Sequence, residues 1–559
     1  MRRRKFVADF ETNTDPENCN VWAVGIFEIK KHVFRYGNNI DYLFRFMHNN
    51  PNIDIYFHNL KFDGEFIIYY LLKHGFKWVK DKKEMNENEF TTLISDAGQW
   101  YSISICMKVE EITEERNIIN IYDSLKVLPM TVTEIPAAFG LNIHKLEIEY
   151  TDIRESDHKL TDQEVSYLRN DCEIVALALE ALFEEKLTKM TTAANALASF
   201  KKLKGNKQFD RLFPVLEYDG FIRKAYRGGF TYVNPIYQGK DIENGIVLDV
   251  NSLYPSRMLH EVLPYGEGKL FHGAYEPDEH YKLYVIHFTC TFDLKPGYLP
   301  TVQLKNNLRF NPTEYISTSN GMDIELYMTN VGYELFIEHY DVSNINFIDG
   351  YKFRGCSGMF DEYINFWNAK KVEATQTGNK ALRKIAKLML NSLYGKFGLS
   401  PVLRGKIPYL LDDVVKYRLG EKEERDPIYI PVAVFITAYA RQVTITTAQR
   451  LIDRFIYSDT DSLHLIGNEI PNNIDIDDTK IGAWAHESTF SRARFIRAKT
   501  YIEEINGELE VKCAGLPDKA KKFVTWENFR SGAIYGGKLV PKHVKGGLIL
   551  AETDFTIKS

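Results

Sequence analysis

The sequence lacks the marks of a secreted, zinc-binding or membrane-spanning protein. Its six cysteines are scattered over 559 residues without a CxxC pair, so we expect neither a zinc ribbon nor a disulfide framework, and a reducing cytoplasm fits. The first residues, MRRRKFVADFET, are basic and then acidic without an apolar segment, so no signal peptide is expected. The longest apolar run, IPVAVFITAYA at 430–440, is too short to span a bilayer.

The overall charge and composition exclude less. A formal net charge of -6 argues against a uniformly basic nucleic-acid binder. A net charge does not reveal local basic patches, however, and carboxylates that bind metal make it more negative. Apolar residues make up 44% and charged residues 26%, which is typical of a folded globular protein, and we find no repeat or low-complexity tract. The length predicts about three to four domains.

The chain changes character several times along its length. The segment 1–190 alternates short apolar runs with polar turns and closes with a helical stretch at 162–187, which predicts a mixed α/β domain with a boundary near residue 190. The segment 255–363 predicts short strands and turns without a strong helix signal, whereas 362–396 shows long helical periodicity. The segment 398–427 predicts a polar hairpin, and the chain is basic from about residue 514.

Two aspartates stand one residue apart in the apolar run IYSDTDSLHL. In a strand, Asp459 and Asp461 would point to the same face, where two carboxylates repel each other unless a cation lies between them. The alternative is an Asp-Thr-Asp turn between two strands, and the pair by itself leaves both open. Asp249, at the end of the apolar run 246–248, is a candidate helix N-cap or a third carboxylate. With the pair as neighbours, a metal site is favoured.

A second acidic set lies near the start of the sequence. Asp9 and Glu11 in VADFET have the same i, i+2 spacing, and HNLKFDG supplies Asp63 beside Asn59. Each of these acids alone is usually a solvated side chain. Together with a later YxxxD they form the set that a two-metal nuclease needs, because several carboxylates must hold two ions roughly 3.5–4 Å apart.

The YxxxD segment and one lysine complete this set. Asp171 follows Tyr167 by four residues, one helical turn. Tyr167 could orient the attacking water, and Lys145 could neutralise developing phosphate charge, although an ordinary surface lysine is the alternative.

A cationic stripe is predicted on a helix in RKIAKLMLNSLYGKFG. Arg383, Lys387, Asn391 and Tyr394 recur at spacings of four, four and three, and Lys371 lies upstream in the same helical region. Such a stripe is most often the solvated side of an amphipathic helix. A nucleotide polymerase, however, needs cations over a triphosphate and a flat ring under the new base pair.

These segments together resemble a known family. DVNSLYP, KLMLNSLYG and YSDTDS, in that order, resemble the three polymerase motifs of family B DNA polymerases, and DFET, NLKFDG and YLRND resemble its three proofreading exonuclease motifs. AYRGGF, KTY and KCAG make the chain similar to the protein-primed replicases of small tailed phages, the phi twenty-nine type. The resemblance spans essentially the whole chain.

The resemblance implies an α/β (α+β) multidomain fold, with an RNase H-like 3′–5′ exonuclease domain followed by a right-hand polymerase of palm, fingers and thumb with two insertions. The implied segments are 1–190 (exonuclease), 191–260 (first palm part), 261–362 (terminal-protein region 1), 363–398 (fingers), 399–427 (terminal-protein region 2), 428–513 (second palm part) and 514–559 (thumb).

Roles in the polymerase centre follow from the same resemblance. Tyr254 would exclude a ribose 2′-OH, Tyr394 would pack on the nascent pair, and Lys499 would stabilise primer and nucleotide. The implied metal ligands are Asp249, Val250 through its backbone, Asp459 and Asp461, and the implied nucleotide contacts are Tyr254, Lys371, Arg383, Lys387, Asn391, Tyr394 and Lys499.

Roles in the exonuclease centre and on DNA are implied in the same way. The catalytic and metal-binding set is Asp9, Glu11, Asp63 and Asp171, aided by Tyr167 and Lys145. The implied DNA contacts are Thr12, Asn59, Phe62, Ser124 and Leu125 at the frayed 3′ end, and Tyr226, Arg227, Gly228, Gly229, Thr500 and Tyr501 elsewhere.

The resemblance also implies cofactors, partners and a location. Each centre would take two Mg²⁺ or Mn²⁺ ions. The partners would be primer-template and single-stranded DNA, dNTPs and a terminal priming protein bound as a heterodimer, the chain being otherwise a monomer without a membrane span. It would carry out protein-primed, strand-displacing, processive replication of a linear phage genome in the cytoplasm of the infected bacterial host.

Two departures and three alternatives accompany this interpretation. Ser458 stands where most of the family has Gly, and the segment EEINGELEV at 503–511 is shorter than expected, which puts the palm-to-thumb geometry in doubt. A glycosyltransferase could also use a DxD pair, but has no need for DFET or YxxxD. A DNA-binding scaffold with relict sites would let the carboxylates drift, and an ordinary DNA-primed enzyme would lack the insertions.

Overall fold

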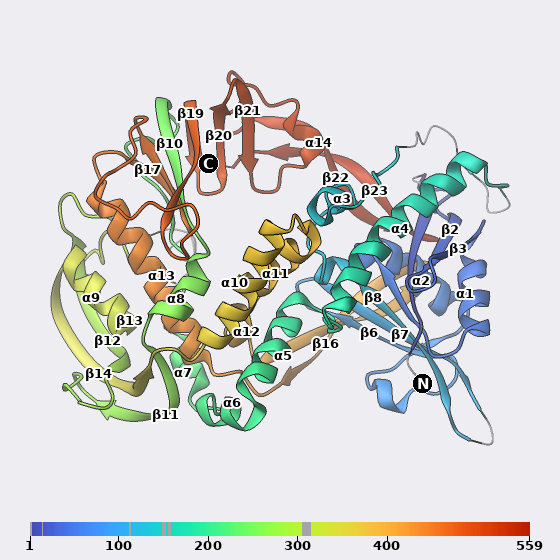
Figure 1. Cartoon of the computed structure of the whole chain (residues 1–559), viewed down its shortest axis with the longest axis horizontal. Helices are drawn as coiled ribbons and strands as arrows, with labels where there is room; N and C mark the ends of the chain where they lie inside the picture. The colour runs from blue at the N-terminus through green and yellow to red at the C-terminus, as the bar shows by residue number, and fades with distance from the viewer. Residues whose placement is uncertain are drawn as a thin grey trace.

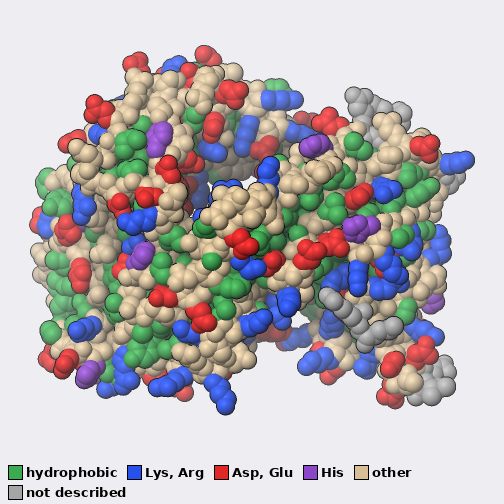
Figure 2. Space-filling view, in the orientation of Figure 1, with side chains coloured by type: hydrophobic (Ala, Val, Ile, Leu, Met, Phe, Trp, Pro, Cys, Tyr) green, Lys and Arg blue, Asp and Glu red, His purple; other side chains and the backbone are tan. Residues whose placement is uncertain are grey.

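The computed structural model describes residues 3–13, 15–110, 113–147, 153–154, 158–304 and 315–558. Part of the predicted first insertion, residues 305–314, therefore lies outside the described residues. Figure 1 shows two sheet-containing lobes, with the helices α10 and α11 between them and the C-terminal strands β22 and β23 reaching from one lobe to the other. Figure 2 shows that the molecule is hollowed between the lobes.

The N-terminal lobe is built on an eight-stranded sheet in the order β3-β2-β1-β4-β8-β7-β6-β5. The helix α4 packs on β1 and β2, and the predicted helical stretch at 162–187 is confirmed by it. The bounds are β1 Lys5–Thr12, β2 Val21–Glu28, β3 Val33–Gly37, β4 Asp54–Phe57, β5 Lys77–Trp78, β6 Glu89–Ile94, β7 Trp100–Val109, β8 Arg116–Asp123, α1 Ile40–Asn49, α2 Leu60–Lys73, α3 Ile135–Phe139 and α4 Asp162–Glu184.

The other lobe holds a seven-stranded sheet in the order β21-β20-β19-β10-β18-β17-β9. Its central strand β10 pairs with β18, although all the elements from α8 to β17 lie between them in the sequence, so distant parts of the chain meet there. The bounds are β9 Thr231–Val233, β10 Asp241–Val250, β17 Phe455–Asp459, β18 Ser462–Ile466, β19 Trp484–Arg497, β20 Thr500–Ile505, β21 Glu508–Cys513, α8 Leu253–His260 and α13 Ile430–Arg450.

The palm-to-thumb segment at 503–511 is a tight hairpin between β20 and β21. Asn506 (φ 53°) and Gly507 (φ 80°) both adopt the left-handed backbone that a two-residue hairpin turn needs. The pairing places Thr500 directly opposite Cys513, so the KTY and KCAG segments lie side by side despite the short connection.

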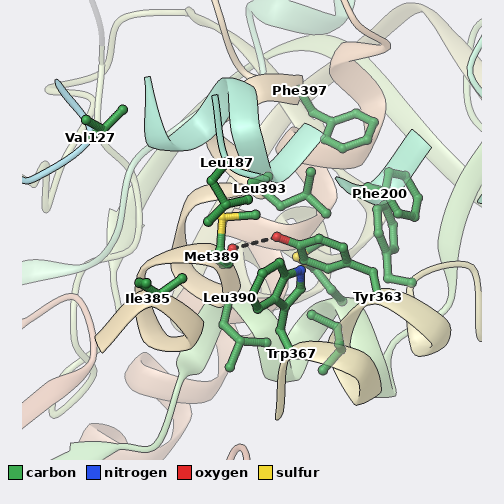
Figure 3. Close-up of a cluster of buried hydrophobic side chains, with 14 of the residues drawn as sticks. Val127, Leu187, Phe200, Tyr363, Trp367, Ile385, Met389, Leu390, Leu393 and Phe397 are labelled. Atoms are coloured by element: carbon green, nitrogen blue, oxygen red, sulfur yellow. Dashed lines mark hydrogen bonds between the residues drawn. The ribbon is translucent and has the colours of Figure 1, made fainter. Parts of the chain in front are cut away.

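The region between the lobes is a bundle of helices around an aromatic core (Figure 3). In this core the Tyr363 hydroxyl donates to the Met389 carbonyl at 2.7 Å, and the rings of Phe200 and Phe360 stack. The predicted helical periodicity over 362–396 is confirmed, but it belongs to separate helices, because Gly378 (φ 70°) interrupts the first and Asn379 caps the next. The bounds are α5 Thr192–Lys204, α6 Asn206–Leu212, α7 Asp219–Arg223, α10 Asp361–Gln376, α11 Lys380–Ser392 and α12 Tyr394–Phe397.

Two excursions and a C-terminal hairpin complete the fold. The first excursion is a four-stranded sheet, β11-β14-β12-β13, with one helix, α9, that the sequence pattern did not indicate. Thr329 caps this helix, and its side chains Leu335, Phe336 and His339 are buried. The predicted hairpin at 398–427 is confirmed. The bounds are β11 Leu263–His272, β12 Leu283–Leu294, β13 Ile324–Thr329, α9 Asn330–His339, β14 Tyr340–Cys356, β15 Val402–Leu411, β16 Val414–Glu424, α14 Asp518–Lys521, β22 Ile534–Val544 and β23 Gly547–Thr556.

The hairpins meet the N-terminal lobe at one buried acid. Glu65 of α2 accepts a hydrogen bond from the Tyr417 hydroxyl of β16 at 2.6 Å and pairs with His543 of β22 at 3.0 Å. Leu548 and Ile549 of β23 lie within the apolar core of the N-terminal lobe. The three parts therefore close on one another. Within the described residues, no helix is long and apolar enough to cross a membrane.

Two candidate metal-dependent active sites

The Asp459–Asp461 pair lies in a turn. The strand β17 ends at Asp459 and β18 begins at Ser462, while Thr460 has φ 67° and the Asp461 backbone N–H donates to the Asp459 carbonyl at 2.8 Å. The prediction that both carboxylates share one face of a strand is therefore wrong, and the turn alternative describes the backbone correctly. A left-handed residue between two strands reverses the chain, which no count of strand periodicity includes.

The turn is fastened directly to the end of β10. The Val250 backbone N–H donates to the Asp461 carbonyl at 2.8 Å, and Asp249 lies opposite Ser462 in the β10–β18 register. The helix N-cap alternative for Asp249 is wrong, because the N-cap of α8 is Ser252. The structure thus brings Asp249 and the acidic turn together from segments that lie far apart in the sequence.

The negative charges at this centre are only partly compensated by nearby cations. Burial, together with repulsion from Asp461, raises the pKa of Asp249 to about 7. Burial also raises the pKa of Asp461, and repulsion from Asp459 adds to it. Both results are what two crowded carboxylates show without a bound cation.

A further acid, Glu487, belongs to this centre and was missed in the sequence. Its charge contributes to the raised pKa of both Asp249 and Asp461. It sits in β19 where the pairing with β10 skips a residue, since Val247 faces Ser488 and Leu248 faces His486. Such a β-bulge re-aims a side chain, and nothing in the local sequence AHEST signals one.

Polar groups from two other segments hold Asp459. The Thr231 hydroxyl donates to its carboxylate at 3.1 Å, and the Lys499 ammonium lies 3.4 Å from the same oxygen. Lys499 has φ 59°, so the tight β19–β20 connection directs it toward the acidic turn.

The YRGG segment packs against the acidic turn. A Cβ on Gly229 would lie 2.6 Å from the Thr460 side chain, so only glycine fits there, whereas a Cβ on Gly228 would meet nothing within 4 Å. The guanidinium of Arg227 donates to the backbone carbonyls of Gln303, Lys224 and Tyr226. Burial lowers its pKa to about 10, and these hydrogen bonds tie the partly exposed Arg227 to the neighbouring backbone, while its contact with DNA stays a prediction.

The predicted cationic stripe faces the acids from the helices between the lobes. Arg383, Lys387 and Asn391 are exposed along α11, and Lys371 joins them from α10. Burial lowers the pKa of Lys371, and repulsion from Lys387 and Arg383 lowers it further. Three cations in one place favour a polyanionic ligand.

A stacked tyrosine pair lies beside the stripe. The rings of Tyr254 of α8 and Tyr394 of α12 stand 4.1 Å apart with an interplanar angle of 23°. Burial raises the pKa of Tyr254, with further contributions from Tyr394 and Asp461, so the pair lies within electrostatic reach of the acidic turn.

The second centre is built inside the N-terminal lobe. Asp9 and Glu11 come from β1, Asp63 from the first turn of α2, and Asp171 from α4. Burial raises the pKa of Asp9 to about 7, and repulsion from Asp171 adds to the effect. Burial and repulsion from Asp9 likewise raise the pKa of Asp63. The structure thus gathers the four predicted acids.

Lys145 and Tyr167 complete this centre. The Lys145 ammonium donates to Asp171 at 2.5 Å and to the Tyr167 hydroxyl at 3.3 Å. Lys145 is therefore not an ordinary surface lysine. The other oxygen of Asp171, Oδ1, is buried without a hydrogen-bond partner among the described residues.

The donor sets at both centres fit Mg²⁺ or Mn²⁺, which prefer oxygen ligands. The raised pKa values and the orphaned Asp171 oxygen are features that a bound cation relieves. In the described part of the chain, no three acidic, His or Cys side chains form a complete cation site by themselves.

The predicted DNA contacts differ in exposure. Asn59 is exposed at the start of α2, and Thr12, Phe62, Leu125, Tyr226 and Tyr501 are partly exposed. Ser124 is fully buried and donates to the Phe57 carbonyl at 3.0 Å, and Thr500 is also fully buried. The structure corrects the prediction for these two side chains, since neither reaches the surface.

Comparison with known proteins gives consistent results. A family model described as DNA polymerase type B, organellar and viral, matches residues 45–479. The DNA polymerases of Bacillus phages M2 and phi29 are 45% and 44% identical over all of both chains. That of Streptococcus phage Cp-1 is 34% identical over 99% of this chain and 98% of its own. Phi29 DNA polymerase complexed with primer-template DNA and incoming nucleotide substrates has a TM-score of 0.94 at 43% identity, covering all of both chains.

Proposed function

The chain belongs to the organellar and viral type B DNA polymerases, and from this premise we propose that it is a DNA-templated polymerase that also proofreads with a separate 3′–5′ exonuclease centre. The predicted family and fold class are confirmed by the full-length matches, and the glycosyltransferase alternative is excluded. One observation carries the division into two activities: two carboxylate centres lie in different sheets, each with its own cation, Lys499 or Lys145.

In the polymerase centre, Asp249 and Asp461 would hold two divalent ions together with the Val250 carbonyl, and Asp459 would complete the acidic pocket. The ions supply charge neutralisation and lower the pKa of the primer 3′-hydroxyl. The protein's own groups do the positioning. Lys371, Arg383 and Lys387 grip the triphosphate, and Asn391 lies on the same exposed face of α11.

The tyrosine pair sets the shape of the nucleotide pocket. The Tyr254 ring stacks on Tyr394, which restricts its movement, and in this proposal it would block the space that a ribose 2′-hydroxyl needs. The Tyr394 ring would pack on the new base pair. Lys499 keeps a positive charge beside Asp459, where the primer end and the nucleotide meet.

In the exonuclease centre, Asp9, Glu11, Asp63 and Asp171 would hold two ions beside the frayed 3′ end. The Tyr167 hydroxyl orients the attacking water, and its contact with Lys145 fixes its direction. The Lys145 ammonium offsets charge that develops on the scissile phosphate.

The second insertion supports strand displacement. The hairpin β15–β16 lies against β6, where the Asp96 backbone N–H donates to the Arg404 carbonyl at 2.8 Å. Between them is a cavity of about 1610 Å³ whose lining includes Lys80, Lys126, Lys396 and Arg418. A cavity with more basic than acidic lining residues would suit a single template strand, which would be separated from its complement on entering.

The first insertion, the phage origin of the relatives and the resemblance support protein priming. We assign the partners as primer-template and single-stranded DNA, dNTPs and a terminal protein bound as a heterodimer, with the polymerase otherwise a monomer. The setting is the cytoplasm of an infected bacterial host. The ordinary DNA-primed alternative does not account for the four-stranded sheet β11-β14-β12-β13 and the β15–β16 hairpin, which we assign to the two insertions.

Primed single-stranded circular DNA tests this function. With Mg²⁺ and dNTPs but no helicase or clamp, we expect products longer than the circle, separated on an alkaline gel. Products that stop at one circle length would support the polymerase activity but contradict strand displacement. Extension without any degradation of mismatched primer ends would remove proofreading.

A further inference from the structure

A buried histidine–glutamate pair lies behind the polymerase centre and has no role in the chemistry described so far. The Nδ1 atom of His464, on β18, lies 2.7 Å from Oε1 of Glu503, on β20. The two residues are 2% and 3% exposed. In the sheet order, β20 and β18 are separated by β19 and β10, so the pair joins strands that are not hydrogen-bonded neighbours. The sheet must curl for them to meet.

Aromatic rings pack around the His464–Glu503 pair on the concave side of the curled sheet. Tyr457, Phe495 and Tyr501 surround His464, with ring centroids 5.2–5.3 Å from the imidazole. Tyr457 belongs to β17, directly before the acidic turn, and Tyr501 belongs to β20. The pair and its rings therefore connect the strand that carries Asp459 to the strand that follows Lys499.

A second set of contacts shows what the curl positions. The Lys499 backbone N–H donates to the Tyr457 hydroxyl at 3.0 Å, and the Lys499 ammonium lies 3.4 Å from Asp459. Burial raises the pKa of Tyr457, and its hydrogen bond to Asp459 and the nearby charge of Glu503 contribute. The Tyr457 hydroxyl thus stands between the lysine loop and the acidic turn, with Glu503 behind it.

We propose that His464 and Glu503 are positioning residues for nucleotide binding, because their contact holds the curled sheet that sets Lys499 against Asp459. Neither residue touches substrate. A buried pair of this kind fixes geometry more reliably than it stabilises the fold, since its removal in favour of apolar side chains is often neutral in stability. The effect should appear in nucleotide binding and leave the exonuclease centre, in the other sheet, untouched.

The inference rests on the proposed function, and steady-state kinetics on a primed template test it. Glu503→Gln keeps a hydrogen-bond partner for His464, and we expect KM for dNTP within about 2-fold of the parent. Glu503→Leu should raise KM about 10-fold with a smaller change in kcat, which marks lost binding. Degradation of labelled single-stranded DNA by the same preparations should stay unchanged and reports folding.

Three comparisons make the result decisive. In a Lys499→Ala background, Glu503→Leu should add little, because residues acting through one contact are not additive. The double variant His464→Leu/Glu503→Leu leaves no unpaired buried group and provides a folded test if Glu503→Leu is unstable. The matched control is Glu504→Leu, whose carboxylate instead accepts from Ser491 at 2.9 Å on the exposed side.

Several outcomes would overturn the proposal. An unchanged KM in Glu503→Leu or in the double leucine variant would do so, as would full additivity with Lys499→Ala or an equal effect of Glu504→Leu. If the acidic turn were not the polymerase centre, the result would be different, because the Asp459→Ala variant would still extend primers.

Discussion

The two carboxylate centres are built in contrasting ways. The proposed exonuclease centre takes its acids from β1, α2 and α4 of one lobe, and its lysine is hydrogen-bonded to Asp171. The proposed polymerase centre joins β10 to the acidic turn, while Lys371, Arg383 and Lys387 approach it from the separate helices α10 and α11. The first centre therefore has its lysine in contact with an acid in the folded chain, whereas most cations of the second lie on the opposing helices, where we propose that the triphosphate binds.

The strongest test of this separation removes one acid from each centre. Asp459→Ala should abolish primer extension, by at least about 1000-fold, while leaving degradation of single-stranded DNA intact. Asp9→Ala should do the reverse, because the centres share no ligand. Gel assays of a 5′-labelled primer with and without dNTPs measure both. Loss of both activities in either variant would contradict two independent centres.

Removing the built-in lysine should have the next largest effect. Lys145→Ala takes the ammonium from Asp171 and Tyr167, and we expect exonuclease turnover to fall about 100-fold, the usual cost of one electrostatic contact in an active site. Primer extension should stay within about 2-fold. Lys499→Ala is the counterpart in the other centre, and an equal loss of exonuclease activity in both variants would show that the lysines act on overall stability.

Two neighbouring glycines sharpen the comparison further. Gly229→Ala brings a methyl group against Thr460, and we expect primer extension to fall about 10-fold with exonuclease activity unchanged. Gly228→Ala meets no neighbouring atom and should have a smaller effect. If the two variants were equally impaired, approach of DNA to the backbone would explain the glycines better than packing on the acidic turn.

The smallest expected effect is a pH dependence of stability without metal. Asp9 has its pKa raised to about 7, so between about pH 4 and 7 the folded protein binds more protons than the unfolded chain. Stability in EDTA should therefore decrease as pH rises through this window, and Mg²⁺ should stabilise more at pH 8 than at pH 5.5.

Thermal melts of the parent and Asp9→Asn measure this effect. The variant should lose part of the slope, because its side chain does not titrate. A parent whose Tm in EDTA rises steadily up to pH 8, with the same slope as Asp9→Asn, would contradict a crowded, desolvated carboxylate at this position.

The motifs located the acids, but the sequence could not supply their geometry. Asp9 and Asp171 were found because DFET and YLRND are short and local. The turn at Thr460 and a strand with both carboxylates on one face were left open, because an apolar run predicts a strand whether or not one residue adopts a positive φ. Glu487 depends on a bulge between β10 and β19, which exists only once these two strands, distant in the sequence, are paired. The hydrogen bond from Arg227 to the Gln303 carbonyl could not be read from AYRGGF either, because Gln303 lies far away in the sequence.

The contact of β23 with the N-terminal lobe has a consequence for the order of synthesis. Leu548 and Ile549 fill part of that lobe's apolar core, and a Cβ on Gly547 would lie 2.5 Å from Phe66. A ribosome adding about 5–20 residues per second needs about 20–70 s to travel from residue 190 to residue 549. During that interval the nascent lobe exposes an apolar surface, so we expect it to bind chaperones until the final hairpin covers this surface.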